Sequence, residues 1–401
     1  MASTANATAA SAPPARKGPR IYSREAVLAG CCATLLVLLA FTATINRIYH
    51  RKIHTVADSW AAQGDASAAA GNLPQAITEY RNSLVFSPSN ELYQFRLAQA
   101  LASTGINDNE AQNYLINLWN ESPGNGPINL ELARVAAHRK DGYSDALRYY
   151  HSAIDGEWNG NPVGHRWDVR KELCDYLLRG GRIEQARVEV MALADNTPTE
   201  ETDQVLVVGQ LLLKTQEWTR ALDLFRPLTT GDHPNPVALA GAGTAAFNLG
   251  EYVTARDYFL RLPPDRRSEA DVTAMLAIAH QVMASDPYLS GLSVKDRALR
   301  ASNAVAAASE RANACIAQNP PSTPNGPVAR AVAQLRLNAA QFDRMSTDWN
   351  EHNLASFPDR LEDAMSLAFA TEGAAATACG EPQGKDRPLW LLSRARIGQA
   401  N

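Results

Sequence analysis

Residues 57–90, ADSWAAQGDASAAAGNLPQAITEYRNSLVFSPSN, decide the fold of this 401-residue chain. Gly64 and Ala76 are small residues at points where two antiparallel helices must approach closely, and Gly71 lies in the turn between them. Pro88 ends the second helix, because proline lacks the amide hydrogen that a helix interior requires. The stretch therefore predicts a helical hairpin with one apolar face, which only a neighbouring hairpin can cover.

The same small, bulky and turn positions recur downstream. The small residue of the second helix recurs at spacings of 35, 35, 40, 35 and 34 residues, at Ala76, Ala111, Ala146, Ala186, Ala221 and Ala255. Further packing positions are Trp60, Tyr80, Gly209, Gly243 and Phe259. This pattern strongly resembles the tetratricopeptide repeat (TPR) family, whose period is 34 residues. The 40-residue spacing is explained by the loop at residues 156–167.

The resemblance implies an all-α solenoid of about six to seven helical hairpins. The predicted parts are six repeats at residues 53–264, a degenerate seventh hairpin at 265–318 and capping helices at 319–401. A terminal cap gives the last repeat a polar outer face.

An apolar run precedes the repeats. Residues 26–45 carry no charge, and a helix of that length covers roughly 30 Å, the thickness of the hydrocarbon layer. We therefore predict a transmembrane helix at 26–46, after a disordered basic tail at 1–25. A lipobox ending at Cys31 is the alternative, but only five apolar residues precede that cysteine, and a signal core needs about 7 to 15.

The charge distribution bears on orientation and on partners. Residues 1–52 hold seven Lys or Arg and one acid, whereas the rest holds 31 bases and 41 acids. The basic flank slightly favours a cytoplasmic amino terminus and an exported, periplasmic-side solenoid. An acidic body repels phosphate backbones, so nucleic acid is excluded as an expected partner.

The resemblance also implies where partners bind. In this family the concave groove lined by the first helices carries function, and we expect protein or peptide partners there. Phe95 and Phe247 would supply apolar contacts, and Arg134 and Lys171 would pair with acidic groups. The predicted groove residues are Phe95, Gln99, Arg134, Lys171, Asp175, Gln210, Thr244 and Phe247.

The sequence offers little for catalysis. The eight histidines are scattered, no C-x-x-C occurs, and no metal or cofactor is expected. Asp348, Glu351 and His352 lie close together, and we interpret them as a polar loop. Cys315 and Cys379 are either plain thiols or, in an oxidising compartment, a disulfide in the cap.

The predicted function is a membrane-anchored scaffold or adaptor that supports assembly of an envelope complex, and not an enzyme. Two alternatives remain open at this stage. One is a fixed structural subunit of a secretion or envelope-assembly machine. The other is an enzyme with its site in residues 265–401.

Overall fold

The structure is a computed structural model that describes residues 24–105, 107–319 and 326–399. Most of the predicted tail at 1–25 and most of the proline-rich break after residue 319 lie outside the described residues. The described chain is helical throughout apart from its turns and one isolated bridge, so the predicted all-α fold class is confirmed. It forms two compact units, Met1–Glu157 and Trp158–Asn401, which are described separately.

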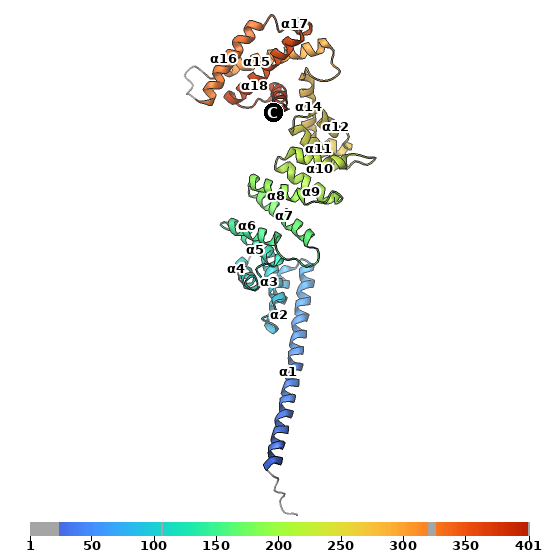
Figure 1. Cartoon of the computed structure of the whole chain (residues 1–401), viewed down its shortest axis with the longest axis vertical. Helices are drawn as coiled ribbons and strands as arrows, with labels where there is room; N and C mark the ends of the chain where they lie inside the picture. Colours follow the sequence, from blue (N-terminus) through green and yellow to red (C-terminus); the bar gives the residue numbers. More distant parts are fainter. Residues whose placement is uncertain (1–23, 106, 320–325, 400–401) are drawn as a thin grey trace, which may run out of the picture. The chain divides into compact units, whose positions relative to one another are not determined.

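The first unit is a series of antiparallel helix pairs (Figure 1). Each second helix packs on its own first helix, and each next pair packs on the one before. The helices are α1 (Arg24–Ala69), α2 (Leu73–Phe86), α3 (Glu91–Thr104), α4 (Asp108–Glu121), α5 (Gly126–His138) and α6 (Tyr143–Ile154).

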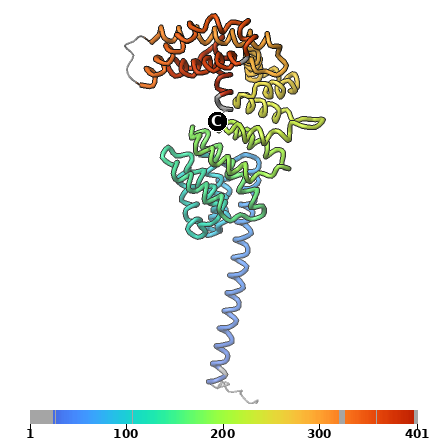
Figure 2. Tube along the Cα trace, turned by 45° about the horizontal axis from the view of Figure 1, so that its top comes forward, coloured from blue at the N-terminus to red at the C-terminus, as the bar shows by residue number. Residues whose placement is uncertain are grey.

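Helix α1 joins the apolar run to the first repeat without a break, as Figure 2 shows. Its 46 residues include an 18-residue window of mean hydropathy 2.2, none of which is buried in the protein. By length and composition it is the one candidate membrane span in the described residues. The prediction left residues 47–52 between anchor and solenoid, whereas the structure continues the helix through them.

The second unit begins with further helix pairs. These helices are α7 (Pro162–Arg179), α8 (Ile183–Asp195), α9 (Thr202–Lys214), α10 (Trp218–Phe225), η1 (Arg226–Thr229), α11 (Pro236–Asn248), α12 (Tyr252–Leu260), α13 (Pro264–Arg267) and α14 (Ala270–Ser285). Their shared core is centred on Phe225, Leu239 and Phe259, which are almost fully buried.

The unit ends in a helical bundle. Its helices are α15 (Val294–Gln318), α16 (Pro327–Met345), α17 (Glu351–Ser356), α18 (Pro358–Cys379), η2 (Gly384–Asp386) and α19 (Arg387–Gln399). The prediction grouped residues 294–318 with the seventh hairpin. In the structure α15 packs mainly against α16, α17 and α18, around Phe342, Trp349 and Met365.

Local signals set the helix ends. Asparagine side chains cap several first helices; Asn90, for example, accepts a hydrogen bond from the Tyr93 amide at 3.1 Å. The hairpin turns use a left-handed residue at one fixed position. Gly71, Gly181 and Gly250 occupy it with φ near +77°, +69° and +80°, and Gln216 occupies it with φ +63°. Glycine tolerates this conformation because it lacks a Cβ.

Candidate functional site: the first-helix faces

The distance between paired helices is set by glycine facing an aromatic ring. A Cβ built on Gly64 would lie 2.5 Å from Tyr80 Cε1, and one on Gly243 would lie 2.5 Å from Phe259 Cε1. The aromatic ring fits against the first helix only because the residue it faces is glycine, which has no side chain. The aromatic side chains thereby pack on backbone, and the first helices are held in fixed register.

The second-helix small residues behave as the pattern predicts. All six are fully buried, with no exposed side-chain surface: Ala76, Ala111, Ala146, Ala186, Ala221 and Ala255. Trp60 is half-buried, and Gly71 is exposed in its turn. These residues build the scaffold on which the first-helix faces stand.

In the first unit, acidic side chains of α1 link to the next hairpin. The Tyr93 hydroxyl on α3 donates a hydrogen bond to Asp58. Asp65 accepts from the Tyr80 hydroxyl at 2.8 Å and from Arg96 Nη1 at 2.6 Å. Burial, together with the Asp58 acceptor, raises the pKa of Tyr93 to about 12, so this hydroxyl stays a donor at neutral pH.

One buried carboxylate organises the next part of this face. Glu131 on α5 is 2% exposed, and its Oε1 accepts from Gln99 Nε2 at 2.9 Å and from Arg134 Nη1 at 2.8 Å. The structure thus brings two predicted groove residues, Gln99 and Arg134, onto one shared partner. A buried charge needs such donors, because an unpaired carboxylate in an apolar interior is costly.

An apolar patch adjoins these polar side chains on α3. Phe95 is half-buried, and Leu92, three residues earlier on the helix, is 53% exposed. Residues three apart lie on the same helix face. We call Asp58, Asp65, Leu92, Phe95, Gln99 and Arg134 the first-helix face of the first unit.

The groove residues of the second unit make mostly local contacts. Lys171 Nζ pairs with Asp175 at 2.8 Å within α7, and the Thr244 hydroxyl donates to the Ala240 carbonyl at 2.9 Å within α11. Phe247 packs edge to face on Tyr252, with ring centroids 5.4 Å apart. Gln210 is half-buried on α9.

These contacts bear on the predicted pairing with acidic peptide groups. Arg134 and Lys171 each have an intramolecular carboxylate at 2.8 Å. An acidic ligand would have to compete with Glu131 or Asp175 for them. The predicted role of the two cations in binding stays untested.

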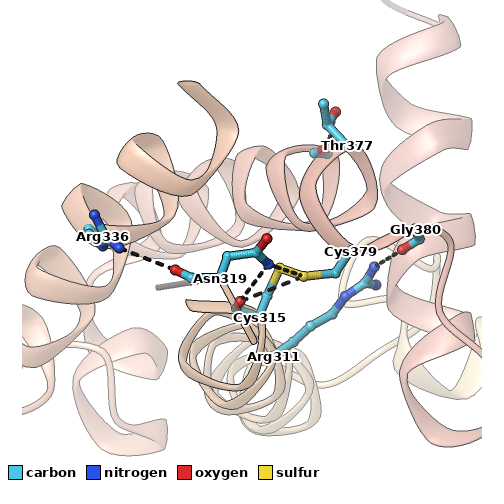
Figure 3. Close-up of a disulfide and its surroundings, with 8 residues drawn as sticks. Arg311, Cys315, Asn319, Arg336, Thr377, Cys379 and Gly380 are labelled. Carbon is cyan, nitrogen blue, oxygen red and sulfur yellow. Dashed lines mark hydrogen bonds between the residues drawn. A yellow bond between two sulfur atoms is a disulfide. The ribbon is translucent and has the colours of Figure 1, made fainter. Parts of the chain in front are cut away.

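The bundle of the second unit contains a disulfide between α15 and α18. Cys315 and Cys379 are bonded, with their Cα atoms 6.0 Å apart. Figure 3 shows Asn319 beside this bond: its Nδ2 lies 3.0 Å from the Cys315 carbonyl and 3.2 Å from Cys379 Sγ. Arg336 donates to the Asn319 carbonyl at 3.3 Å, which fixes the end of α15 against α16.

A buried ion pair lies one turn away. Arg311 forms an ion pair with Glu372. Arg311 also donates to the Gly380 carbonyl at 3.1 Å, as Figure 3 shows. Their side chains are 9% and 1% exposed. Burial raises the pKa of Glu372 from 4.5 to about 7, and the Arg311 charge opposes that rise. No local sequence pattern predicts this pair, because its members lie 61 positions apart.

A cavity of about 340 Å³ lies in the second unit between α12, α14 and α19. Its apolar lining includes Val282, Met283 and Leu392, and its polar lining includes Asp286 and Arg396. The two charged groups face each other at 3.4 Å. They satisfy one another within the protein.

Side chains that could serve catalysis or bind a metal do not cluster elsewhere in the described residues. Asp348 accepts from Arg360 at 3.1 Å, Glu351 begins α17, and His352 is exposed. In the part of the chain that the structure describes, no group of three His, Cys, Asp or Glu residues could hold a metal ion.

Sequence reasoning missed the partners that order the first-helix face. Tyr93, Arg96 and Glu131 lie one to three positions away from the nearest expected groove residues, and each pairs with a residue 31 to 35 positions distant. The available signal was an acidic residue on one first helix with a basic or amide side chain at the matching place on the neighbouring first helix. Asp65 faces Arg96, and Glu131 faces Gln99, across neighbouring hairpins.

Comparison with known proteins supplies similar folds. No protein-family model and no curated protein matches this sequence. A solved structure of PilW, described as a type IV pilus biogenesis factor, shares 15% identity, covers 55% of this chain and 98% of its own, and has a TM-score of 0.39. A solved structure of PilF of Pseudomonas aeruginosa shares 18% identity and covers 56% of this chain and 99% of its own. Its TM-score is also 0.39.

The TPR domain of P58(IPK) shares 13% identity and covers 86% of this chain and 98% of its own, with a TM-score of 0.19. At these values the similarities concern the fold alone. This chain's own geometry is a series of helical hairpins, each packed on the next. The chain has a TPR-like fold.

Proposed function

We propose that this chain is a membrane-anchored scaffold that binds a segment of a partner protein on the first-helix face of its first unit. The observation that carries the proposal is the Glu131 carboxylate, which holds Gln99 and Arg134 in place beside Phe95. Side chains ordered before binding lose less conformational entropy when a ligand arrives.

The chemistry of this face indicates the ligand. Leu92 and Phe95 offer apolar surface, while Asp58 and Asp65 add carboxylates. Residues 57–157 as a whole hold 12 acids and six bases. A segment with apolar side chains and a basic residue at one end complements such a surface.

The anchor makes weak binding effective. A helix that holds the first repeat at a membrane raises the local concentration of any partner in the same membrane. The mechanism is binding and not catalysis. In this proposal α1 crosses the membrane once and the repeats support assembly of an envelope complex.

The disulfide supports an exported location for the repeats. Disulfides persist in oxidising compartments and are rare in the reducing cytoplasm. A bond between Cys315 and Cys379 therefore favours a cytoplasmic amino terminus with the helical units outside. A reporter that is active only outside the cytoplasm, fused to the carboxyl terminus, tests this orientation. An inactive reporter on full-length protein contradicts it.

The binding proposal is tested with the full chain in its native membrane. Phe95→Ala removes a ring from the face, and we expect affinity for co-purifying partners to fall about tenfold. Val188→Ala is the matched control, because Val188 is an exposed aliphatic residue on the second helix α8. Partners that stay bound at full strength to both Phe95→Ala and Leu92→Asp would rule out this face.

A further inference from the structure

The loop at residues 156–167 carries an Asn-Gly pair. Asn159 and Gly160 lie outside any helix, between the bridge residue Glu157 and the start of α7, and both are exposed. Gly160 has φ +83°, a left-handed conformation that glycine adopts without strain. A Cβ built on Gly160 would meet no atom within 4 Å, so the space around this backbone is open.

The residues on either side of the pair are held in place, whereas the pair itself is not. The Trp158 ring stacks on the His165 ring, with centroids 4.8 Å apart and planes at 23°. Asn161 caps α7, and its side chain accepts from a backbone amide at 3.0 Å. Within the described residues, neither the Asn159 side chain nor the Gly160 amide has a hydrogen-bond partner.

An exposed Asn-Gly pair can close a ring on itself, and asparagine is a thermolabile residue for this reason. The Gly160 backbone nitrogen loses its proton to water or hydroxide and attacks Cγ of Asn159. The Cγ–Nδ2 bond breaks, and the side-chain nitrogen takes up a proton and leaves as ammonia. A cyclic imide remains, in which the Gly160 nitrogen is bonded to both carbonyl carbons of residue 159.

Water then opens the imide in one of two ways. Cleavage of the bond to Cγ gives aspartate in a normal backbone. Cleavage of the bond to the main-chain carbonyl carbon gives isoaspartate, in which the backbone runs through the side chain of residue 159. The sum of the steps consumes one water and releases one ammonia, without oxidation or reduction, so no other reactant is required.

A second Asn-Gly pair in the chain lies in the opposite environment. Gly126 is buried at the start of α5, and its amide donates to the Glu157 carbonyl at 3.0 Å. The side-chain oxygen of Asn125 accepts from the Ile128 amide at 3.1 Å. Both the attacking nitrogen and the amide that it would attack are therefore engaged, and these hydrogen bonds must break before a ring can form.

We propose that Asn159 is a modification site of this protein, at which spontaneous deamidation through Gly160 produces aspartate and isoaspartate. The inference is independent of the proposed membrane anchor and of the first-helix face. The aspartate product adds a negative charge just before the amino terminus of α7, where the helix dipole favours it. The isoaspartate product adds a carbon atom to the backbone between Trp158 and the cap residue Asn161.

The experiment incubates the purified full-length chain in detergent, at mildly alkaline pH and physiological temperature. Mass spectrometry of peptides measures conversion separately at each Asn-Gly pair, including Asn325, which lies outside the described residues. We expect conversion about tenfold faster at Asn159 than at Asn125, because the Gly126 amide must first leave its hydrogen bond and its helix. Isoaspartate is measured by enzymatic methylation of its free carboxyl group from S-adenosylmethionine.

Unfolding the chain is the control for structure. In guanidinium chloride neither pair keeps its hydrogen bonds, so Asn125 and Asn159 should convert at similar rates. A large difference that persisted in the unfolded chain would assign the selectivity to neighbouring residues and not to the fold.

Two variants test the mechanism at Asn159. Gly160→Ala places a methyl group beside the attacking nitrogen and should slow conversion about tenfold. Asn159→Gln keeps an amide but requires a larger ring, so this peptide should stay unmodified and the methylation signal should fall. Equal conversion at Asn125 and Asn159 in the folded chain would overturn the proposal, as would an unmodified Asn159 or a rate that Gly160→Ala leaves unchanged.

Discussion

The ring of Tyr80 lies against the backbone of Gly64, where a Cβ would approach Tyr80 Cε1 to 2.5 Å. The aromatic residue follows its glycine by 16 positions, and the same interval relates Gly209 to Phe225 and Gly243 to Phe259. The contact recurs because each hairpin brings the same two levels of its helices together. It is the repeated unit of packing in both halves of the chain.

Gly209→Ala should destabilise the second unit. A methyl group there would meet the Phe225 ring, which also packs on Gly241 and has no free side on which to move. Overpacking of this kind costs about 1–3 kcal/mol, more than the roughly 1 kcal/mol that alanine gains in helix propensity. Chemical denaturation of the full chain in detergent measures the difference.

Gly373→Ala is the matched control. Gly373 lies inside α18, and a Cβ there meets no atom within 4 Å. Only the propensity gain remains, so this substitution should raise the free energy of unfolding by up to about 1 kcal/mol. Equal destabilisation by both substitutions would show that the glycine–aromatic contact is not the cause.

How much of the packing could be predicted from the sequence depends on how far apart in the sequence the contacting residues lie. Glycine and ring lie 16 residues apart inside one hairpin, so a local pattern predicts them. The Glu131 contact with Gln99 spans 32 positions, and the Arg311 pair with Glu372 spans 61. Such contacts depend on how hairpins stack, which the period alone does not determine.

The continuity of α1 was missed for a different reason. The sequence boundary near residue 46 rested on polarity, where charged residues follow the apolar run. Backbone hydrogen bonding in a helix does not depend on side-chain polarity, and no glycine or proline occurs in residues 31–63. Helix α1 therefore continues from the apolar run into the charged residues that follow it.

Gln216→Gly should stabilise the chain. Gln216 is the one described non-glycine residue with positive φ, at +63°, and it occupies the turn position held by Gly71, Gly181 and Gly250. A left-handed conformation costs an L-residue about 1–2 kcal/mol, and the flexibility of glycine in the unfolded chain returns part of that. We expect a net gain of about 0.5–1 kcal/mol in unfolding free energy.

The reverse substitution is its control. Gly181→Gln places a side chain at the equivalent turn, where φ is +69° and a Cβ meets nothing within 4 Å. This substitution should lower the free energy of unfolding by about as much as Gln216→Gly raises it. If both substitutions leave the unfolding midpoint unchanged, the turn conformation carries no measurable strain.

Reduction of the disulfide should loosen the terminal bundle. The bond between Cys315 and Cys379 closes a loop with a sequence separation of 64, for which chain-entropy arguments give roughly 4 kcal/mol. Dithiothreitol should lower the melting temperature of the wild-type chain and leave a Cys315→Ser with Cys379→Ser variant unaffected. A reductant-insensitive wild type, with both thiols free to alkylating reagent, would mean that the bond is not formed in the isolated protein.

Stability of the second unit should fall as pH rises toward and through about 7. Burial raises the pKa of Glu372 from 4.5 to about 7, against the opposing charge of Arg311, so the folded chain holds this proton more tightly than the unfolded chain does. The resulting stabilisation is complete below about pH 4.5 and is lost as pH rises through about 7. Melting temperatures between pH 5 and pH 8 measure it.

Glu372→Gln keeps a neutral group of the same size and should flatten the pH dependence of stability, whereas Asp363→Asn, at an exposed position on the same helix, should not. An unchanged slope in Glu372→Gln would assign the pH dependence to another group.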